Sequence, residues 1–136
     1  MDNTQHPTSN ERSNERKFSV VRRAKSFAHA GRGIRILVKT THNFWIHIVF
    51  FGLALIFGLL FHITRLDWMM LFLAAGMVMA AEAFNTAIEI DIDLTSPEVH
   101  PFARDSKDVA AGAVLITAIT ALIIGLFIFV PYIFAL

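Results

Sequence analysis

The stretch that decides the fold is "MMLFLAAGMVMAAEAFNTAIEIDID", residues 69–93, in which thirteen uncharged residues run directly into an acidic segment. On an ideal helix at about 100° per residue, five polar residues of this stretch fall within about 100° of arc: Glu82, Asn85, Thr86, Glu89 and Asp93. A charge without a partner in hydrocarbon costs at least about 2.5–3.5 kcal/mol. This polar stripe therefore predicts a functional face rather than a face in contact with lipid.

The composition is that of a membrane protein. The 136 residues give room for one domain, 55% of them are hydrophobic, and only 17% are charged. Cysteine is absent, which excludes disulfides and thiolate metal sites.

Around the stripe, the pattern predicts an all-α integral membrane fold over residues 18–136. Three apolar segments, about 45–63, 66–90 and 109–134, are each long enough to cross a hydrocarbon core of about 30 Å. Before them, residues 18–40 alternate apolar and basic positions, which predicts an amphipathic helix lying in the membrane surface. An ordinary helix facing a partner is the alternative. Residues 1–17 are polar without periodicity and predict a disordered tail.

The distribution of basic residues predicts the orientation. Nine of the twelve Lys and Arg precede residue 46, whereas Arg65 stands alone in the first loop. We therefore expect a cytoplasmic N-terminus, an external C-terminus, and a cytoplasmic loop over residues 91–108. This orientation puts the polar stripe on the side of the membrane where ATP is available.

The residues near this loop are those that phosphoryl transfer requires. Glu82 and Glu89 supply carboxylates for a proton and for Mg²⁺, and Lys107 and Asp108 stand just before the third span. Two other interpretations stay open: an acid paired with a base only to fix helix packing, and a proton relay along the stripe.

Residues 82–116, "EAFNTAIEIDIDLTSPEVHPFARDSKDVAAGAVLI", resemble the signature of the prokaryotic diacylglycerol kinase and undecaprenol kinase family. Residues 26–47, "SFAHAGRGIRILVKTTHNFWIH", resemble the helix and first span of the same family. The resemblance implies a bacterial inner-membrane enzyme, built as a homotrimer of three-span subunits, that phosphorylates a lipid hydroxyl with Mg·ATP. Its partners are then a lipid alcohol and ATP, and no nucleic acid. "SPEVHP" and "NFWIH" are closer to the undecaprenol kinase branch than to the diacylglycerol kinase branch.

The same resemblance implies a role for each residue of the motif. Glu82 matches the catalytic base, Asn85 its supporting amide, and Glu89 a carboxylate that binds the metal and the nucleotide. Three further residues match positions at the nucleotide: Lys107, Asp108 and His100.

Thr41 departs from the family pattern, because a second metal-binding glutamate usually stands at this position. A threonine hydroxyl offers only a neutral oxygen, and the neighbouring His42 is a poor ligand for Mg²⁺. The alternative function is therefore a catalytically impaired descendant that binds nucleotide or lipid at the membrane. His47, placed among apolar neighbours, is expected to have no chemical role.

Overall fold

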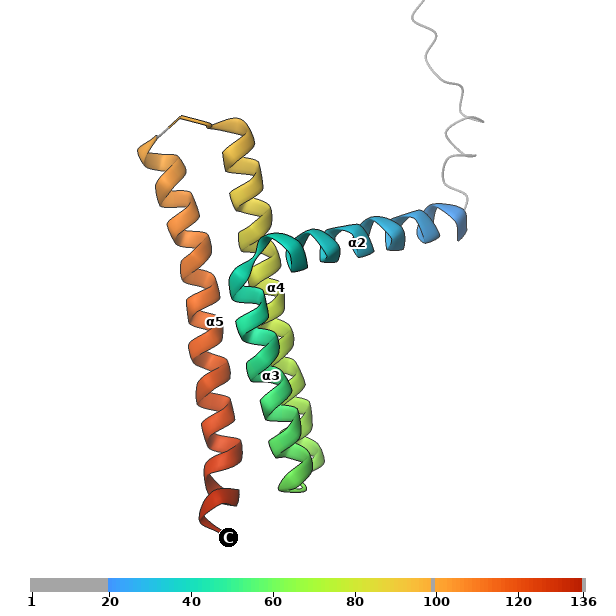
Figure 1. The fold of residues 1–136 in the computed structure, drawn as a ribbon, viewed down its shortest axis with the longest axis vertical. Helices are drawn as coiled ribbons and strands as arrows, with labels where there is room; N and C mark the ends of the chain where they lie inside the picture. The colour runs from blue at the N-terminus through green and yellow to red at the C-terminus, as the bar shows by residue number, and fades with distance from the viewer. Residues whose placement is uncertain (1–19, 99, 136) are drawn as a thin grey trace, which may run out of the picture. The chain divides into compact units, whose positions relative to one another are not determined.

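The computed structural model describes residues 20–98 and 100–135. Every regular element in this part of the chain is an α-helix: α2 (Val20–Thr40), α3 (His42–Leu60), α4 (Arg65–Thr95) and α5 (Pro101–Phe134) (Figure 1). The all-helical prediction is confirmed. Helix α2 corresponds to the expected amphipathic helix, and its location in the membrane surface stays a prediction. The predicted disordered tail, residues 1–17, lies outside the described residues.

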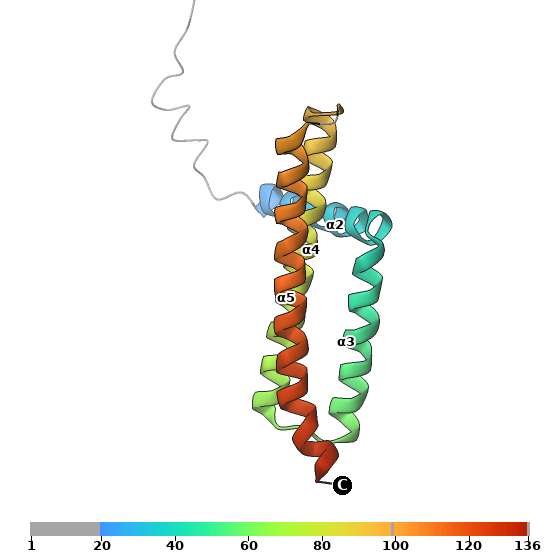
Figure 2. The ribbon, with the colours of Figure 1, turned by 90° about the vertical axis from the view of Figure 1, so that its left-hand side faces the viewer.

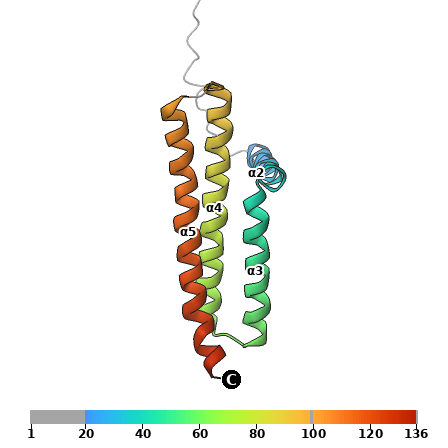
Figure 3. The ribbon, with the colours of Figure 1, turned by 60° about the vertical axis from the view of Figure 1, so that its left-hand side comes forward.

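Helices α3, α4 and α5 are long and apolar enough to cross a membrane. Helix α4 packs along α5 and also contacts α3, and Figure 3 shows it between the two. Helices α3 and α5 approach each other near the turn that joins α3 to α4 (Figure 2), where Phe61 stacks on Tyr132 with ring centroids 6.3 Å apart.

The loop expected over residues 91–108 is wrong, because most of these residues are helical, and their place in the cytoplasm stays a prediction. Helix α4 continues to Thr95 and ends two residues before Pro97, where a proline disfavours helical backbone. Helix α5 begins at Pro101, whose fixed φ suits a first helical position, and the His100 side chain caps it by accepting a hydrogen bond from the Phe102 amide at 3.3 Å. The two helices therefore extend well past the apolar spans.

A polar cluster joins the start of α4 to the end of α5. Thr64 and Asp67 form a reciprocal capping box at the first turn of α4. The Tyr132 hydroxyl donates to Asp67 Oδ2 at 3.0 Å and accepts from the Thr64 amide at 3.2 Å. Just before this cap, His62 turns the chain with a positive φ of 52°.

The apolar core beside this cluster depends on a close approach at Gly58 of α3. A Cβ added at Gly58 would lie 2.7 Å from Trp68 Cη2 and 3.0 Å from Ile63 Cδ1. Gly58 is buried, so the indole ring of Trp68 occupies the space that a side chain would need.

We expect Gly58→Ala to lower the thermal unfolding midpoint in detergent micelles, because forcing a methyl group into a packed core costs about 1–3 kcal/mol. Gly52→Ala is the matched control, since Gly52 lies on the same helix and its Cβ would meet nothing within 4 Å. Both variants share the helix preference of alanine, so their difference isolates the contact with Trp68. Equal midpoints for the two variants would contradict this packing.

Candidate active site

The buried face of α4 changes character along the helix. Its first half buries apolar side chains, and its second half buries polar ones at the same helical spacing: Leu71, Ala74 and Val78, then Glu82, Asn85 and Thr86. Glu89 follows half-buried and Asp93 is exposed. Glu82, at 1% exposure, is the most deeply buried side chain in the described part of the chain. The polar stripe predicted from residues 82–93 is therefore present, and its buried part faces the other helices.

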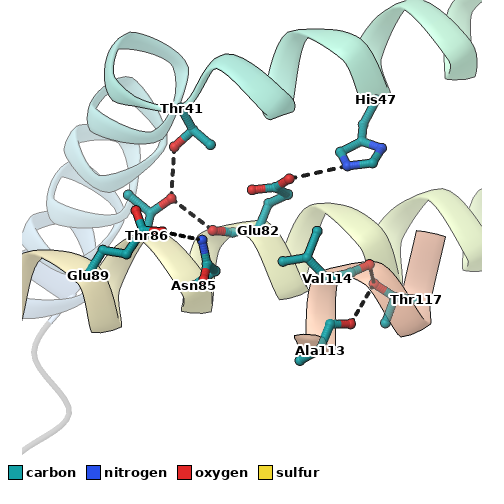
Figure 4. A network of polar contacts seen from close by, with 9 residues as sticks. All are labelled: Thr41, His47, Glu82, Asn85, Thr86, Glu89, Ala113, Val114 and Thr117. Carbon is teal, nitrogen blue, oxygen red and sulfur yellow. Dashed lines mark hydrogen bonds and ion pairs between the residues drawn. The ribbon is translucent and has the colours of Figure 1, made fainter. Parts of the chain in front are cut away.

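Polar contacts tie this stripe to α3 and to the residue before it (Figure 4). The Thr86 hydroxyl donates to the Glu82 carbonyl oxygen at 2.9 Å, and it lies 2.8 Å from the Thr41 hydroxyl. Because a carbonyl can only accept and Thr86 has one hydroxyl hydrogen, Thr41 is the donor in the second bond. Thr41 also has extended backbone (φ −105°, ψ 111°) between α2 and α3. The chain thus bends at the residue that anchors it to α4.

Asn85 connects the buried end of the stripe to Glu89. Its Nδ2 donates to Glu89 Oε1 at 2.9 Å, across one turn of α4. This bond holds the Glu89 carboxylate on the same face as Glu82, and it leaves the second Glu89 oxygen available to a ligand.

The stripe opens into a cavity of about 300 Å³ between the three spans. Helix α4 contributes Glu82, Asn85 and Glu89, and α3 contributes Asn43, Ile46 and His47. The lining from α5 is entirely apolar: Ala111, Val114, Leu115 and Ala118. A cavity with one polar side and one apolar side suits a substrate that carries a polar group on a hydrocarbon body.

Two buried atoms in this cavity, Glu82 Oε1 and Asn85 Oδ1, have no hydrogen-bond partner among the described residues. His47 Nε2 lies 3.2 Å from Glu82 Oε1, which is ion-pair distance. A buried polar atom left unpaired costs about 1–3 kcal/mol. Both residues line the cavity, so a ligand bound there can satisfy these atoms.

The oxygen atoms of this cavity fit Mg²⁺, which prefers oxygen ligands and commonly takes only one or two carboxylates from a protein. Glu89 offers one carboxylate, and Asn85, whose amide nitrogen is bonded to it, offers an amide oxygen without a partner among the described residues. Within the described residues, no three His, Asp or Glu side chains gather as a metal cluster. The Thr41 hydroxyl is engaged by Thr86. Most Mg²⁺ ligands would therefore come from phosphates and water.

Of the four residues predicted to bind the nucleotide, Glu89 lines this cavity and the other three lie outside it. Lys107 forms an ion pair with Asp93 of α4, and Asp108 pairs with Arg104 at 3.6 Å on an exposed face. His100 caps α5. Lys107 is seven residues before the cavity residue Val114, which places it about two turns, or about 10 Å, further along α5.

His47 is the site residue that sequence reasoning missed. Its imidazole faces the most buried carboxylate in the described chain, whereas its apolar neighbours predicted no role. His47 is three residues after Phe44 and so lies on the same side of α3, but only the structure shows that this side is buried.

Comparison with known proteins places these residues in a family. A family model described as prokaryotic diacylglycerol kinase matches residues 28–129, which include all the site residues named above. The chain is 45% identical to the undecaprenol kinase of Bacillus subtilis over 107 residues, covering 79% of this chain and 87% of that protein. It is 41% identical to the diacylglycerol kinase of Synechocystis sp. over 102 residues, covering 74% of this chain and 58% of that protein.

The contact between Thr41 and Thr86 gives a prediction about stability. Thr86→Val keeps the shape of the side chain but leaves the Thr41 hydroxyl without its acceptor, so we expect unfolding to become easier by about 1–3 kcal/mol. Thr120→Val is the control, because Thr120 makes the same bond to a preceding carbonyl, Ile116 O at 2.9 Å, on an exposed face. Unfolding in a denaturing detergent would compare the two. Equal losses would show that the bond to Thr41 contributes nothing.

Proposed function

Because the chain belongs to the prokaryotic diacylglycerol kinase family, we propose that it transfers the γ-phosphate of ATP to the hydroxyl of a membrane lipid alcohol. Lipid kinase activity itself follows from the family and from relatives named undecaprenol kinase and diacylglycerol kinase. The proposal adds ATP as the donor, Mg²⁺ as the cofactor, and the cytoplasmic face of a bacterial inner membrane as the place of reaction.

The observation that carries this proposal is the position of Glu82. A carboxylate at 1% exposure, with one oxygen that lacks a hydrogen-bond partner among the described residues, lines a cavity whose opposite side is apolar. A lipid alcohol that enters with its chain against α5 would bring its hydroxyl to this carboxylate. A base must lie within hydrogen-bond reach of the proton it removes, and Glu82 meets this requirement for a hydroxyl held in the cavity.

In the proposed reaction, Glu82 takes the hydroxyl proton as the lipid oxygen forms a bond to the γ-phosphorus. The bond from that phosphorus to the bridging oxygen breaks, and ADP leaves. Asn85 holds Glu89 in place by its hydrogen bond, and Glu89 with Asn85 would hold Mg²⁺. Bound Mg²⁺ would neutralise charge on the phosphates. Lys107, Asp108 and His100, further along α5 and at its start, would contact the rest of the nucleotide.

Undecaprenol is the acceptor that we propose. The undecaprenol kinase relative matches over 87% of its own length, whereas the Synechocystis diacylglycerol kinase matches over 58%. The motifs "SPEVHP" and "NFWIH" support the same branch. Diacylglycerol is the other acceptor that the family allows.

The proposed orientation has the N-terminus in the cytoplasm and the C-terminus outside, because nine of the twelve Lys and Arg precede the first span. We further propose a homotrimer. Large apolar side chains remain exposed along all three spans, and neighbouring subunits would cover part of this surface, with lipid covering the rest.

The test is phosphorylation by purified protein in mixed micelles that contain radiolabelled ATP and either undecaprenol or diacylglycerol. We expect wild-type protein to label undecaprenol faster. Glu82→Gln should lower kcat by about 10²–10⁴-fold, because the amide keeps the shape but cannot accept the proton. Glu98→Gln, a change at an exposed acid outside the cavity, is the control and should retain activity. Full activity of Glu82→Gln would remove Glu82 from the reaction.

Thr41 gives a further prediction. Its hydroxyl is bonded to Thr86, and Thr86 lies three residues before Glu89 on the same face of α4. An acid at position 41 would add a carboxylate near the phosphates. Thr41→Glu should therefore lower the apparent KM for Mg·ATP, most strongly at low magnesium. Thr41→Gln, of the same size but neutral, is the control and should not. If wild type and Thr41→Glu both bind nucleotide but phosphorylate no lipid, the catalytically impaired descendant becomes the better account.

A further inference from the structure

The proposed reaction leaves a proton on a side chain that water reaches poorly. Glu82 is 1% exposed and lies in the middle of a helix that crosses the membrane. Each turnover needs Glu82 as a carboxylate again, so the proton has to leave before the next lipid reacts. With lipid and nucleotide in the cavity, little water is left beside Glu82 to take it.

The titratable groups that line the cavity are few. Helix α4 presents Glu82 and Glu89, α3 presents His47, and the lining residues from α5 are all apolar. Glu89 is held by Asn85 and lies seven residues, or about 10 Å, along α4 from Glu82. His47 Nε2 lies 3.2 Å from Glu82 Oε1. His47 is therefore the nearest base to Glu82 among the groups that line the cavity.

The imidazole is also less enclosed by protein than the acid is. The His47 side chain is 20% exposed, against 1% for Glu82. Figure 4 shows one ring nitrogen pointing at the Glu82 carboxylate and the other pointing away from it. An imidazole can accept a proton on one nitrogen and release a proton from the other.

We propose that His47 is a positioning residue for Glu82 that carries its proton away after each phosphoryl transfer; this inference rests on the proposed function. Once Glu82 has taken the lipid proton, its O–H bond breaks and an N–H bond forms at Nε2 of neutral His47. The products are a carboxylate and an imidazolium. The imidazolium then loses the proton on its other nitrogen to water, which leaves a neutral imidazole with its hydrogen on Nε2. Proton exchange of the two ring nitrogens with water restores the starting tautomer before the next turnover.

The experiment compares kcat, KM and the pH profile of wild type and His47→Gln in the mixed-micelle assay. Glutamine can still donate a hydrogen bond to Glu82 but cannot take up a proton. We expect kcat to fall about tenfold or more, with the KM for Mg·ATP nearly unchanged. The pH profile of kcat should also differ between the two proteins, because glutamine cannot take up a proton at any pH in the assay.

Chemical rescue separates proton transfer from packing. Added imidazole should restore turnover to His47→Ala in proportion to its concentration. Pyrazole, a ring of the same shape that is a far weaker base, should not. His62→Asn is the control for losing a histidine, because His62 is exposed in the turn after α3 and asparagine tolerates its positive φ of 52°. It should keep wild-type kcat and pH profile.

The outcomes that would overturn the inference are distinct. If wild type is active and His47→Gln has the same kcat and pH profile, the role of His47 is overturned while the proposed function stands. Equal rescue by imidazole and pyrazole would have the same consequence. A wild type that phosphorylates no lipid would overturn the proposed function and this inference with it.

Discussion

Glu82 sits buried in a helix that crosses a membrane, facing an imidazole on the neighbouring helix, and the other features of the site follow from that placement. A carboxylate in such a position is costly unless protein groups or a water-filled cavity surround it. The chain supplies both. Helix α3 brings His47 against the acid, and the space between the three spans leaves a cavity on its other side. If α3 moved away from α4, Glu82 would lose its nearest polar side chain from another helix.

The position of α3 against α4 is set from both ends. Association of helices in lipid gains little from the hydrophobic effect and relies on close packing and hydrogen bonds. At one end, the Thr41 hydroxyl bonds to Thr86. At the other end, Gly58 lets Trp68 pack against α3, and the capping box of Thr64 and Asp67 begins α4. His47 and Glu82 lie between these contacts, so their distance is fixed by packing on either side.

The sequence predicted the parts of this site that lie on one helix. The regular rotation of about 100° per residue is enough to place Glu82, Asn85 and Glu89 on one face. It could not predict His47, because the distance between two helices depends on packing that has no local signature. It also predicted a loop over residues 91–108, most of which are helical. Pro101 instead occupies the first turn of a helix, where its missing amide hydrogen costs nothing.

Burial decreases along α4 in the order that the proposed chemistry needs. Glu82 is enclosed by protein. Glu89, seven residues further along α4, is half-buried, and Asp93 is exposed and paired with Lys107. A base works best where water does not compete for the substrate hydroxyl, whereas a nucleotide with its metal has to enter and leave through water. Separating the two along one helix meets both demands without a moving part. In this arrangement the proposed proton transfer leaves the proton on the enclosed Glu82, far along α4 from the exposed acids. A base on the adjacent helix, rather than a further acid on α4, is then the shortest way out for that proton.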